Sequence, residues 1–441
     1  MATTITPTIV TVNTTVTQAP TVSQLQQSGA IISTGGTTLA TNAYQYCGTL
    51  AQVTAILSAP LALTSLTWAS GTVTATSAAS LALTTGETFT TTIAGATPAG
   101  YNGTFVATVT GLDTFTYALA TDPGLETAPG TYLPDDAAFV RDAATTFFAQ
   151  GGSVGVYVLE LGPFTTSALA IAGLETWITG NSSPQVFYSY LIPRAWDTAD
   201  SATLNTMAAN YSSPSGQTYF FVTTTAANVG SYATTKSVLT FEESPTKAST
   251  EVQAASVFYQ WLVNNPGPAN PLAPMSYRYL YGVTPWEQMG NATAINTALT
   301  AYANLVLTGA EGGISTATLF KGTTMDGYQA AFWYAIDWFR IQVKQALAAA
   351  IINGSNSNPP LLYNQAGINS LKAVANRIGN DAVAYGCALS VTITAVDFAT
   401  YTAANPSDYA AGIYNGFAAT VVGPSSFLTI TFNLDAVTFV L

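Results

Sequence analysis

The chain has 441 residues, of which 48% are apolar, so it can build folded cores and is long enough for two or three domains. Only 7% of the residues are charged, against about 25% in an ordinary soluble protein, so we expect much of the exterior to contact other protein. The net charge of −12, without any Lys/Arg cluster, argues against nucleic-acid binding, and no apolar run reaches the ~18 residues of a membrane span.

The N-terminal residues 1–20 are rich in Thr, Val and Ile and have no helical period, which predicts a β-prone arm. Such an arm is too short to form its own core and needs a pairing partner to be ordered. Residues 21–64 follow as turns and one short helix, which we assign to the first part of a larger core. The apolar arm residues expected to contact a partner are Ile5, Ile9 and Val12.

Residues 65–133 differ in composition, with short Thr- and Val-rich alternations between Gly turns. Their spacing predicts the strands of a small inserted β-sandwich. The stretches 95–105 and 113–117 resemble a β-module that is often inserted in phage structural proteins. We favour a surface decoration over a carbohydrate-binding role for this module.

Residues 134–330 alternate predicted helices with apolar strands, which indicates an α/β domain with a mostly parallel sheet. No set of acids and bases follows the predicted strands. The helices are expected at 137–150, 168–179 and 199–211, and the strands at 156–161, 186–192 and 218–223.

Residues 331–426 contain two amphipathic helices, the first with an apolar stripe from Ile336 to Ile351 and the second from Ile368 to Ile378. The last segment, 427–441, alternates apolar and polar residues with the period of a strand. Its apolar residues are Leu428, Ile430, Phe432 and Leu434. The predicted fold is therefore a multidomain chain of the α/β and α+β classes with a β-arm at each end.

The chemistry available to the chain is narrow because it has no histidine. Nucleophile systems with an imidazole base are excluded, and no phosphate-binding glycine motif occurs. The acid pairs Asp135–Asp136 and Glu242–Glu243 could serve glycoside chemistry, but we favour solvated loop or helix-start acids. We therefore predict no catalytic residue, no cofactor and no metal. The lack of a signal-peptide pattern and the two lone cysteines fit a reducing cytoplasm.

Three segments, 337–344, 361–368 and 383–388, resemble the C-terminal core of contractile phage tail sheath proteins. That family has an acid-plus-Trp helix, a loop whose Gly-Ile opens a second helix, and then a small-residue strand start. Residues 23–33 and 37–40 are similar to the start of the same family. The resemblance covers both ends of the chain, about 150 residues.

The resemblance implies a non-enzymatic virion protein, a homo-oligomer of hexameric rings stacked as a helical sleeve around a tail tube. In the family, terminal arms add strands to the C-terminal sheets of neighbouring subunits, and contraction drives the tube through the host envelope for genome ejection. The tail tube, baseplate and tail terminator proteins would be its partners. It would assemble in the host bacterial cytoplasm and reside in the virion tail, without nucleic-acid binding or membrane insertion.

Two alternatives remain open at this point. One is a tail-tube or other virion subunit that carries the same inserted module. The other is a carboxylate-dependent glycan hydrolase whose 65–133 module binds sugar. Helical polymers in negative-stain images would favour the sheath, whereas a monomer that clears a glycan substrate would favour the hydrolase.

The basic residues are unevenly distributed. The window 333–378 holds four of the ten and only one acid, Asp337, so its net charge is +3. One interpretation is a set of solvated charges in which Arg340 pairs with Asp337 at i,i+3. The other is that the window lines the inner wall of the sleeve and faces an acidic tube. The residues expected to face the tube are Arg340, Lys344, Lys372 and Arg377.

Overall fold

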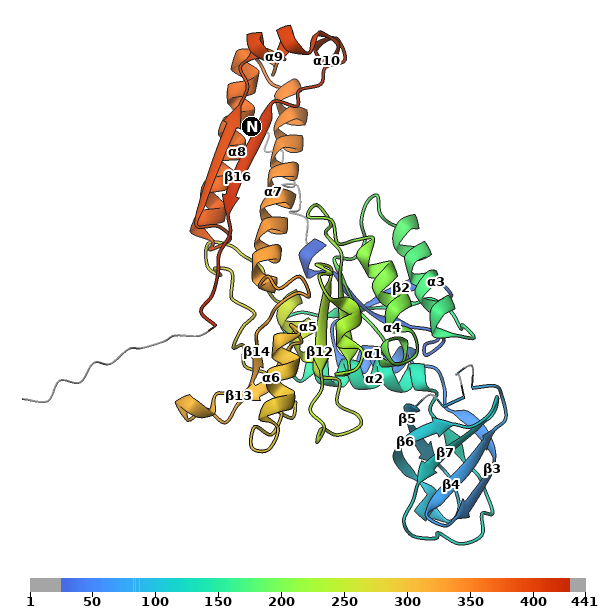
Figure 1. The fold of residues 1–441 in the computed structure, drawn as a ribbon. Coiled ribbons are helices and arrows are strands. Elements are labelled where there is room, and N and C mark those ends of the chain that lie inside the picture. The colour runs from blue at the N-terminus through green and yellow to red at the C-terminus, as the bar shows by residue number, and fades with distance from the viewer. Residues whose placement is uncertain (1–24, 82, 84, 87, 429–441) are drawn as a thin grey trace, which may run out of the picture.

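The computed structural model describes residues 25–428 except 82, 84 and 87. Figure 1 shows three parts: an α/β body in the middle, a small β-domain at one end, and a pair of long helices with a two-stranded sheet at the other. The chain is thus the mixed α/β multidomain protein that the sequence predicts. The predicted arm residues Ile5, Ile9, Val12, Ile430, Phe432 and Leu434 lie outside the described residues.

The body is built on a six-stranded sheet in the order β12-β11-β10-β1-β9-β2. Five strands are parallel, and β2 joins β9 antiparallel at one edge. The parallel strands are almost entirely buried, as a sheet covered on both faces requires. Their bounds are β1 Gly29–Ser33, β2 Ala43–Cys47, β9 Val156–Glu160, β10 Ser189–Leu191, β11 Tyr219–Thr224 and β12 Val238–Glu242.

The parallel sheet was expected within residues 134–330, and its strands β9, β10 and β11 are where the pattern places them. The structure adds β1 between β10 and β9, and β2 beyond β9. Residues 29–47 therefore belong to the sheet of the body, although the sequence assigned 21–64 to a different core. A five-residue apolar run predicts a buried strand but says nothing about which strands flank it.

Helices cover both faces of the sheet. One face packs against α1 (Leu50–Ile56), α2 (Asp135–Phe148) and α5 (Gln253–Leu262), and every residue of α5 is buried. The other face packs against α3 (Ser167–Gly180), α4 (Arg194–Ala209) and α6 (Ala292–Thr300). Large aromatic side chains fill both interfaces, so the body is a three-layer sandwich with two cores.

Shorter elements complete the body. An antiparallel hairpin of β13 (Leu305–Thr308) and β14 (Ala317–Phe320) continues the core, and residues 277–280 hydrogen-bond along β14. The 3₁₀ turns are η1 Leu25–Gln27, η2 Ala99–Tyr101, η3 Val229–Tyr232 and η4 Ala310–Gly312, with η2 in the small β-domain.

The small β-domain is a closed barrel in the order β3-β4-β7-β6-β5-β8, not the predicted sandwich. The two-residue strand β8 pairs with both β3 and β5 and so closes the sheet. A strand of two residues leaves no alternation in the sequence, which is why the closure was missed. The bounds are β3 Leu61–Ala69, β4 Thr72–Ser77, β5 Thr88–Ala94, β6 Gly103–Val109, β7 Thr114–Ala118 and β8 Thr131–Tyr132.

The barrel has its own aromatic core, in which Phe115 contacts Phe89 and Tyr132. It meets the body at α2, where the Arg141 guanidinium donates to Thr92 Oγ1 on β5 at 3.1 Å. A separate core and a small polar contact are typical of an inserted domain.

The C-terminal part, residues 330–422, is called the C-terminal module below. Helix α7 (Ala330–Ser355) and α8 (Gln365–Ala384) form a hairpin, as the two predicted amphipathic stripes indicate. Strands β15 (Ser390–Ala395) and β16 (Phe417–Val422) form an antiparallel pair, and α9 (Phe398–Ala404) and α10 (Pro406–Ala410) connect them. The first half of α7 packs on the body, and the second half projects from it (Figure 1).

Candidate functional site

The two-stranded sheet of the C-terminal module is covered on one face only. Helix α8 packs on it through Ala375, Ile378 and Ala382, which share a core with Ile393 of β15. Gly379 permits this close approach, because a Cβ there would lie 3.0 Å from Val391 Cγ1. In β15 only Ile393 is buried, and β16 has no buried residue. The outer face of the sheet is therefore open to a partner.

The edges of this sheet are open as well. Among the described residues, β15 and β16 bond only to each other, so each has a free outer edge. Exposed apolar side chains flank the strands: Leu389 precedes β15, Val396 follows it, and Val422 ends β16. A free edge with unpaired backbone groups can accept an added strand. This is the candidate assembly surface of the protein.

The segment that follows β16 is fixed where it passes the start of α7. The Gln329 side chain makes three hydrogen bonds to Ser426: its Oε1 accepts from Ser426 N at 2.8 Å and from Oγ at 2.7 Å, and its Nε2 donates to Ser426 O at 2.8 Å. The Tyr277 hydroxyl then donates to the carbonyl of Leu428. Of the predicted arm residues, only Leu428 is described, and it lies against the body.

A buried carboxylate joins α7 to the sheet of the body. Asp337 is fully buried; its Oδ2 accepts from Tyr188 Oη, just before β10, at 2.9 Å and from Tyr219 Oη on β11 at 2.8 Å. Its Oδ1 accepts from Arg340 Nη1 at 3.1 Å. Burial raises the pKa of Asp337 to about 6, although these donors and the nearby Lys236 ammonium oppose the rise. These residues are called the Asp337 centre.

Two cations of the Asp337 centre also hold the loop between α4 and β11. Arg340 donates to the carbonyls of Ser215 and Pro214, both at 3.0 Å. Lys236 donates to the carbonyl of Gly216 at 2.6 Å and lies 4.4 Å from the centroid of the Trp333 ring. Burial lowers the pKa of Lys236. The C-terminal module is thereby fixed to the body by charge-assisted bonds as well as by packing.

The four residues predicted to face a tube all lie on the α7–α8 hairpin, but their surroundings differ. Arg340 uses its donors internally, which matches the expected i,i+3 pair with Asp337. Arg377 forms an exposed pair with Asp381 at 3.3 Å. Lys344 is exposed and Lys372 half-buried, and within the described part of the chain neither makes an ion pair. Lys344 and Lys372 are thus the two cations of the set that remain available.

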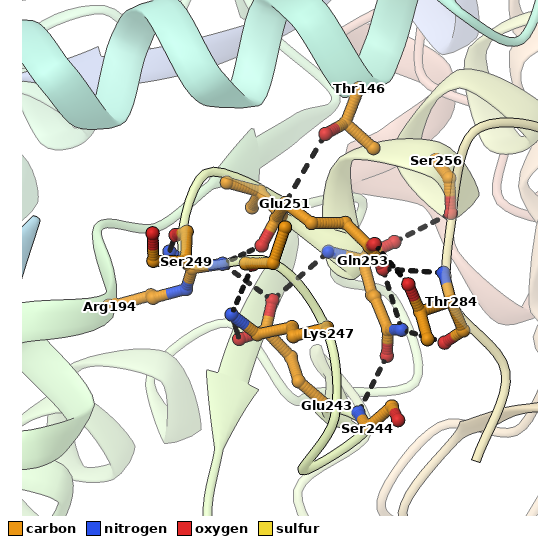
Figure 2. A network of polar contacts seen from close by, with 12 residues as sticks. Thr146, Arg194, Glu243, Ser244, Lys247, Ser249, Glu251, Gln253, Ser256 and Thr284 are labelled. Atoms are coloured by element: carbon orange, nitrogen blue, oxygen red, sulfur yellow. Dashed lines mark hydrogen bonds and ion pairs between the residues drawn. The ribbon is translucent and has the colours of Figure 1, made fainter. Parts of the chain in front are cut away.

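A second charged network lies where α4 begins (Figure 2). Arg194 Nη2 donates to Glu243 Oε1 at 2.8 Å and to the carbonyl of Glu251. Lys247 pairs with Glu243 Oε2 at 3.2 Å, and Gln253 Nε2 donates to Glu251 Oε1 at 2.8 Å. Both carboxylates accept from several donors of the chain itself. The network therefore connects α4, the loop after β12 and α5.

The acid pairs considered for glycoside chemistry do not converge. Glu242 ends β12 as a buried residue whose pKa is raised by burial, while Glu243 accepts from Arg194. Neither is the solvated acid that was expected, since both are buried or nearly so. Asp135 and Asp136 do begin α2 as helix-start acids, and Asp136 Oδ1 accepts from Thr34 Oγ1 at 2.5 Å.

The carboxyl edge of the parallel sheet carries one more acid, Glu160. Its Oε2 accepts from Ser33 Oγ at 2.7 Å and Thr37 Oγ1 at 2.8 Å, and its Oε1 accepts from the backbone N–H of Gly35 at 2.7 Å. This carboxylate holds the loop after β1. A nearby cleft of about 690 Å³ between the end of β9 and α3 is lined by Phe164 and Trp177 and by no titratable residue among those described.

Two further properties concern the described part of the chain. Its His, Cys, Asp and Glu side chains form no group of three that could hold a metal ion. Its helices include none long and apolar enough to cross a membrane.

Several residues of these sites were not singled out in the sequence. Tyr188 and Tyr219 lie in apolar stretches predicted as strands, where a tyrosine is an ordinary core residue. Gln329 and Ser426 are 97 positions apart, so no local pattern connects them. The spacing of Asp337 and Arg340 was the only feature of the sequence that pointed to this site. It predicts the ion pair but not that Asp337 is buried.

No protein-family model and no curated protein matches this sequence. Among solved structures, the fold is similar to a chain in the cryo-EM structure of the anti-feeding prophage baseplate, determined with six-fold symmetrisation. The TM-score is 0.51 at 11% sequence identity, and the match covers 98% of this chain and 100% of the other. At this identity the likeness concerns the fold.

Proposed function

We propose that this protein is a structural subunit of a contractile tail or a related injection machine, and specifically a sheath subunit. The observation that carries the proposal is the sheet β15–β16, which has two free edges and an uncovered face. The fold similarity to a baseplate chain over the full length of both proteins supports the same class. The charge-poor composition favours a protein whose exterior is largely covered by other subunits.

Assembly would proceed by strand addition. The arm segments 1–20 and 427–441 of neighbouring subunits would add to the free edges of β15 and β16, giving main-chain hydrogen bonds in a fixed direction. Because the C-terminal module is fixed to its body by the Asp337 centre, a movement of the module would carry the body with it. Stacked hexameric rings linked in this way could rearrange as rigid bodies during contraction without detaching.

The resulting sleeve would surround a tail tube and end at baseplate and tail terminator proteins in the virion tail. In this proposal the subunit has no catalytic role. The buried carboxylates described above support this, since Glu160, Glu243 and Glu251 are each hydrogen-bonded to groups of the chain itself.

Truncation of either arm tests the proposal. Chains without residues 1–16 or without 427–441 are expected to remain folded, soluble monomers that no longer form tubes, because each loses one donor strand while the body keeps its core. Negative-stain microscopy and sedimentation would measure polymerisation, and circular dichroism would check the fold. The full-length chain is the control and should form helical tubes; tubes from either truncated chain would contradict arm exchange.

Charge reversal tests the proposed tube-facing surface. The variant with Lys344→Glu and Lys372→Glu should bind tubes more weakly than the wild type. Added salt should also weaken the binding of the wild type to tubes, because salt screens the attraction between surface charges. Arg340→Glu is unsuitable because it would disrupt the Asp337 centre. A control reverses Lys321, a cation just after β14 and outside the α7–α8 hairpin, and should bind tubes as the wild type does. Equal co-sedimentation of the double variant and the wild type with tubes at low salt would contradict this orientation.

A further inference from the structure

Three tyrosines of one short surface segment of the body are exposed. Tyr277, Tyr279 and Tyr281 are 43%, 47% and 52% exposed, while the intervening Leu280 is buried. The segment that carries them is held against β14 by three backbone hydrogen bonds, among them Tyr277 N to Leu319 O at 2.7 Å. Tyr279 forms a bridge with Thr318, and the Tyr277 ring contacts Phe320 at 5.2 Å. These contacts hold the segment against β14; its three exposed tyrosines are called the tyrosine row below.

The structure also shows which part of the chain arrives at this row. The three hydrogen bonds between Gln329 and Ser426 fix the path of the chain after β16. Gly423 lets the path run close to α7, because a Cβ there would lie 2.4 Å from the Phe332 ring. Two residues after Ser426, the carbonyl of Leu428 accepts from the hydroxyl of Tyr277, the first member of the row. The thirteen residues 429–441 therefore continue from one end of the tyrosine row.

The chemistry of these residues complements the row. Ile430, Phe432 and Leu434 alternate with polar residues, and Asp435 is the only charged side chain in the segment. A tyrosine ring has an apolar face and a hydroxyl that forms hydrogen bonds. Such rings can therefore bind an extended apolar segment and still let it dissociate. An extended chain advances about 3.3 Å per residue, and Tyr281 lies four residues after Tyr277, so the four residues from Thr429 to Phe432 are long enough to reach from Tyr277 to Tyr281.

We propose that, in the unassembled subunit, residues 429–441 dock on the tyrosine row of their own chain. The contact covers an apolar, strand-forming segment that would otherwise expose its apolar face and promote aggregation. Its regulatory consequence rests on the proposed function: the segment offered to a neighbouring subunit would first have to leave its own body. The same tyrosines thus hold the C-terminal arm until assembly.

Engineered disulfide formation tests the docking directly. The variant Tyr281→Cys with Phe432→Cys, oxidised mildly at low protein concentration, should give a disulfide within one chain, identified by peptide mapping and by a monomer on a non-reducing gel. The native thiols Cys47 and Cys387 are buried and do not compete. The control joins Phe432→Cys to Tyr46→Cys, a similarly exposed tyrosine on the opposite edge strand β2.

The possible results show whether the tyrosine row is occupied by the same chain or by a neighbouring one. A disulfide within one chain between positions 281 and 432 that forms at least tenfold faster than in the control supports the proposal. A disulfide only between two chains assigns the row to a neighbouring copy and overturns it, as does equal reaction of the two pairs. This measurement uses the unassembled subunit, so its result does not depend on tube formation. The proposed function is tested separately, by tube formation.

A second measurement avoids cysteine chemistry. Replacing all three tyrosines by serine removes exposed rings and should leave the fold intact. Cleavage after Phe432 by chymotrypsin should then become about tenfold faster than in the wild type, because the segment has lost its docking surface. An unchanged cleavage rate in the folded triple variant would overturn the proposal.

Discussion

Replacing Asp337 by alanine is expected to lower the free energy of unfolding of the α/β body by about 3–5 kcal/mol at neutral pH. The substitution leaves the hydroxyls of Tyr188 and Tyr219 without their acceptor in a fully buried place. It also removes the ion-pair partner of Arg340. Chemical denaturation followed by tryptophan fluorescence measures the change.

The matched control for this variant is Asp381→Ala on α8. Asp381 also pairs with an arginine of its own helix, but that pair is exposed. Its loss should cost only about 0.3–0.5 kcal/mol, as for other exposed pairs at i,i+4. If both variants lose the same small amount, the Asp337 centre does not fix the C-terminal module to the body.

The second large effect is on the pH dependence of stability. The pKa of Asp337 is raised from 3.8 to about 6 in the folded protein, so the folded state binds this proton more tightly than the unfolded state. Its contribution to stability is complete below about pH 4 and is lost as the pH rises through about 6. From about pH 4 to pH 7, the wild type should lose about 2–3 kcal/mol relative to Asp337→Asn, which cannot titrate.

Other buried acids make this comparison necessary. Burial also raises the pKa of Asp142, Asp197 and Glu242, so the wild-type profile alone does not isolate Asp337. The difference between the wild type and Asp337→Asn removes their shared contribution. Parallel stability profiles for the two proteins across this pH range would show that Asp337 keeps an ordinary pKa.

Local patterns located most of the regular elements. The helices of the C-terminal module were predicted from apolar stripes, and α7 and α8 contain them with additional turns at their ends. The alternation of helices and apolar strands in 134–330 predicted the parallel sheet, which contains β9 to β12. These predictions succeed because burial of one face imposes a period that can be seen within a short window.

Relations between distant segments could not be predicted in this way. The place of β1 in the sheet of the body depends on pairing with β9 and β10, more than 120 residues away. The barrel closes through β8, whose two residues leave no pattern. In both cases the deciding energy is that of backbone pairing between strands, which carries no local signature.

The candidate assembly surface was likewise predicted only in part from the sequence. The sequence by itself determined that the chain is poor in charge, has no imidazole chemistry and carries strand-forming segments at both ends. Only the tertiary structure decided that Asp337 is a buried acceptor rather than half of a surface pair, because its exposure depends on Tyr188 and Tyr219 from the sheet. It also decided that β15 and β16 keep free edges. Composition and period are properties of neighbouring residues, whereas burial and free edges depend on which distant segments pack together.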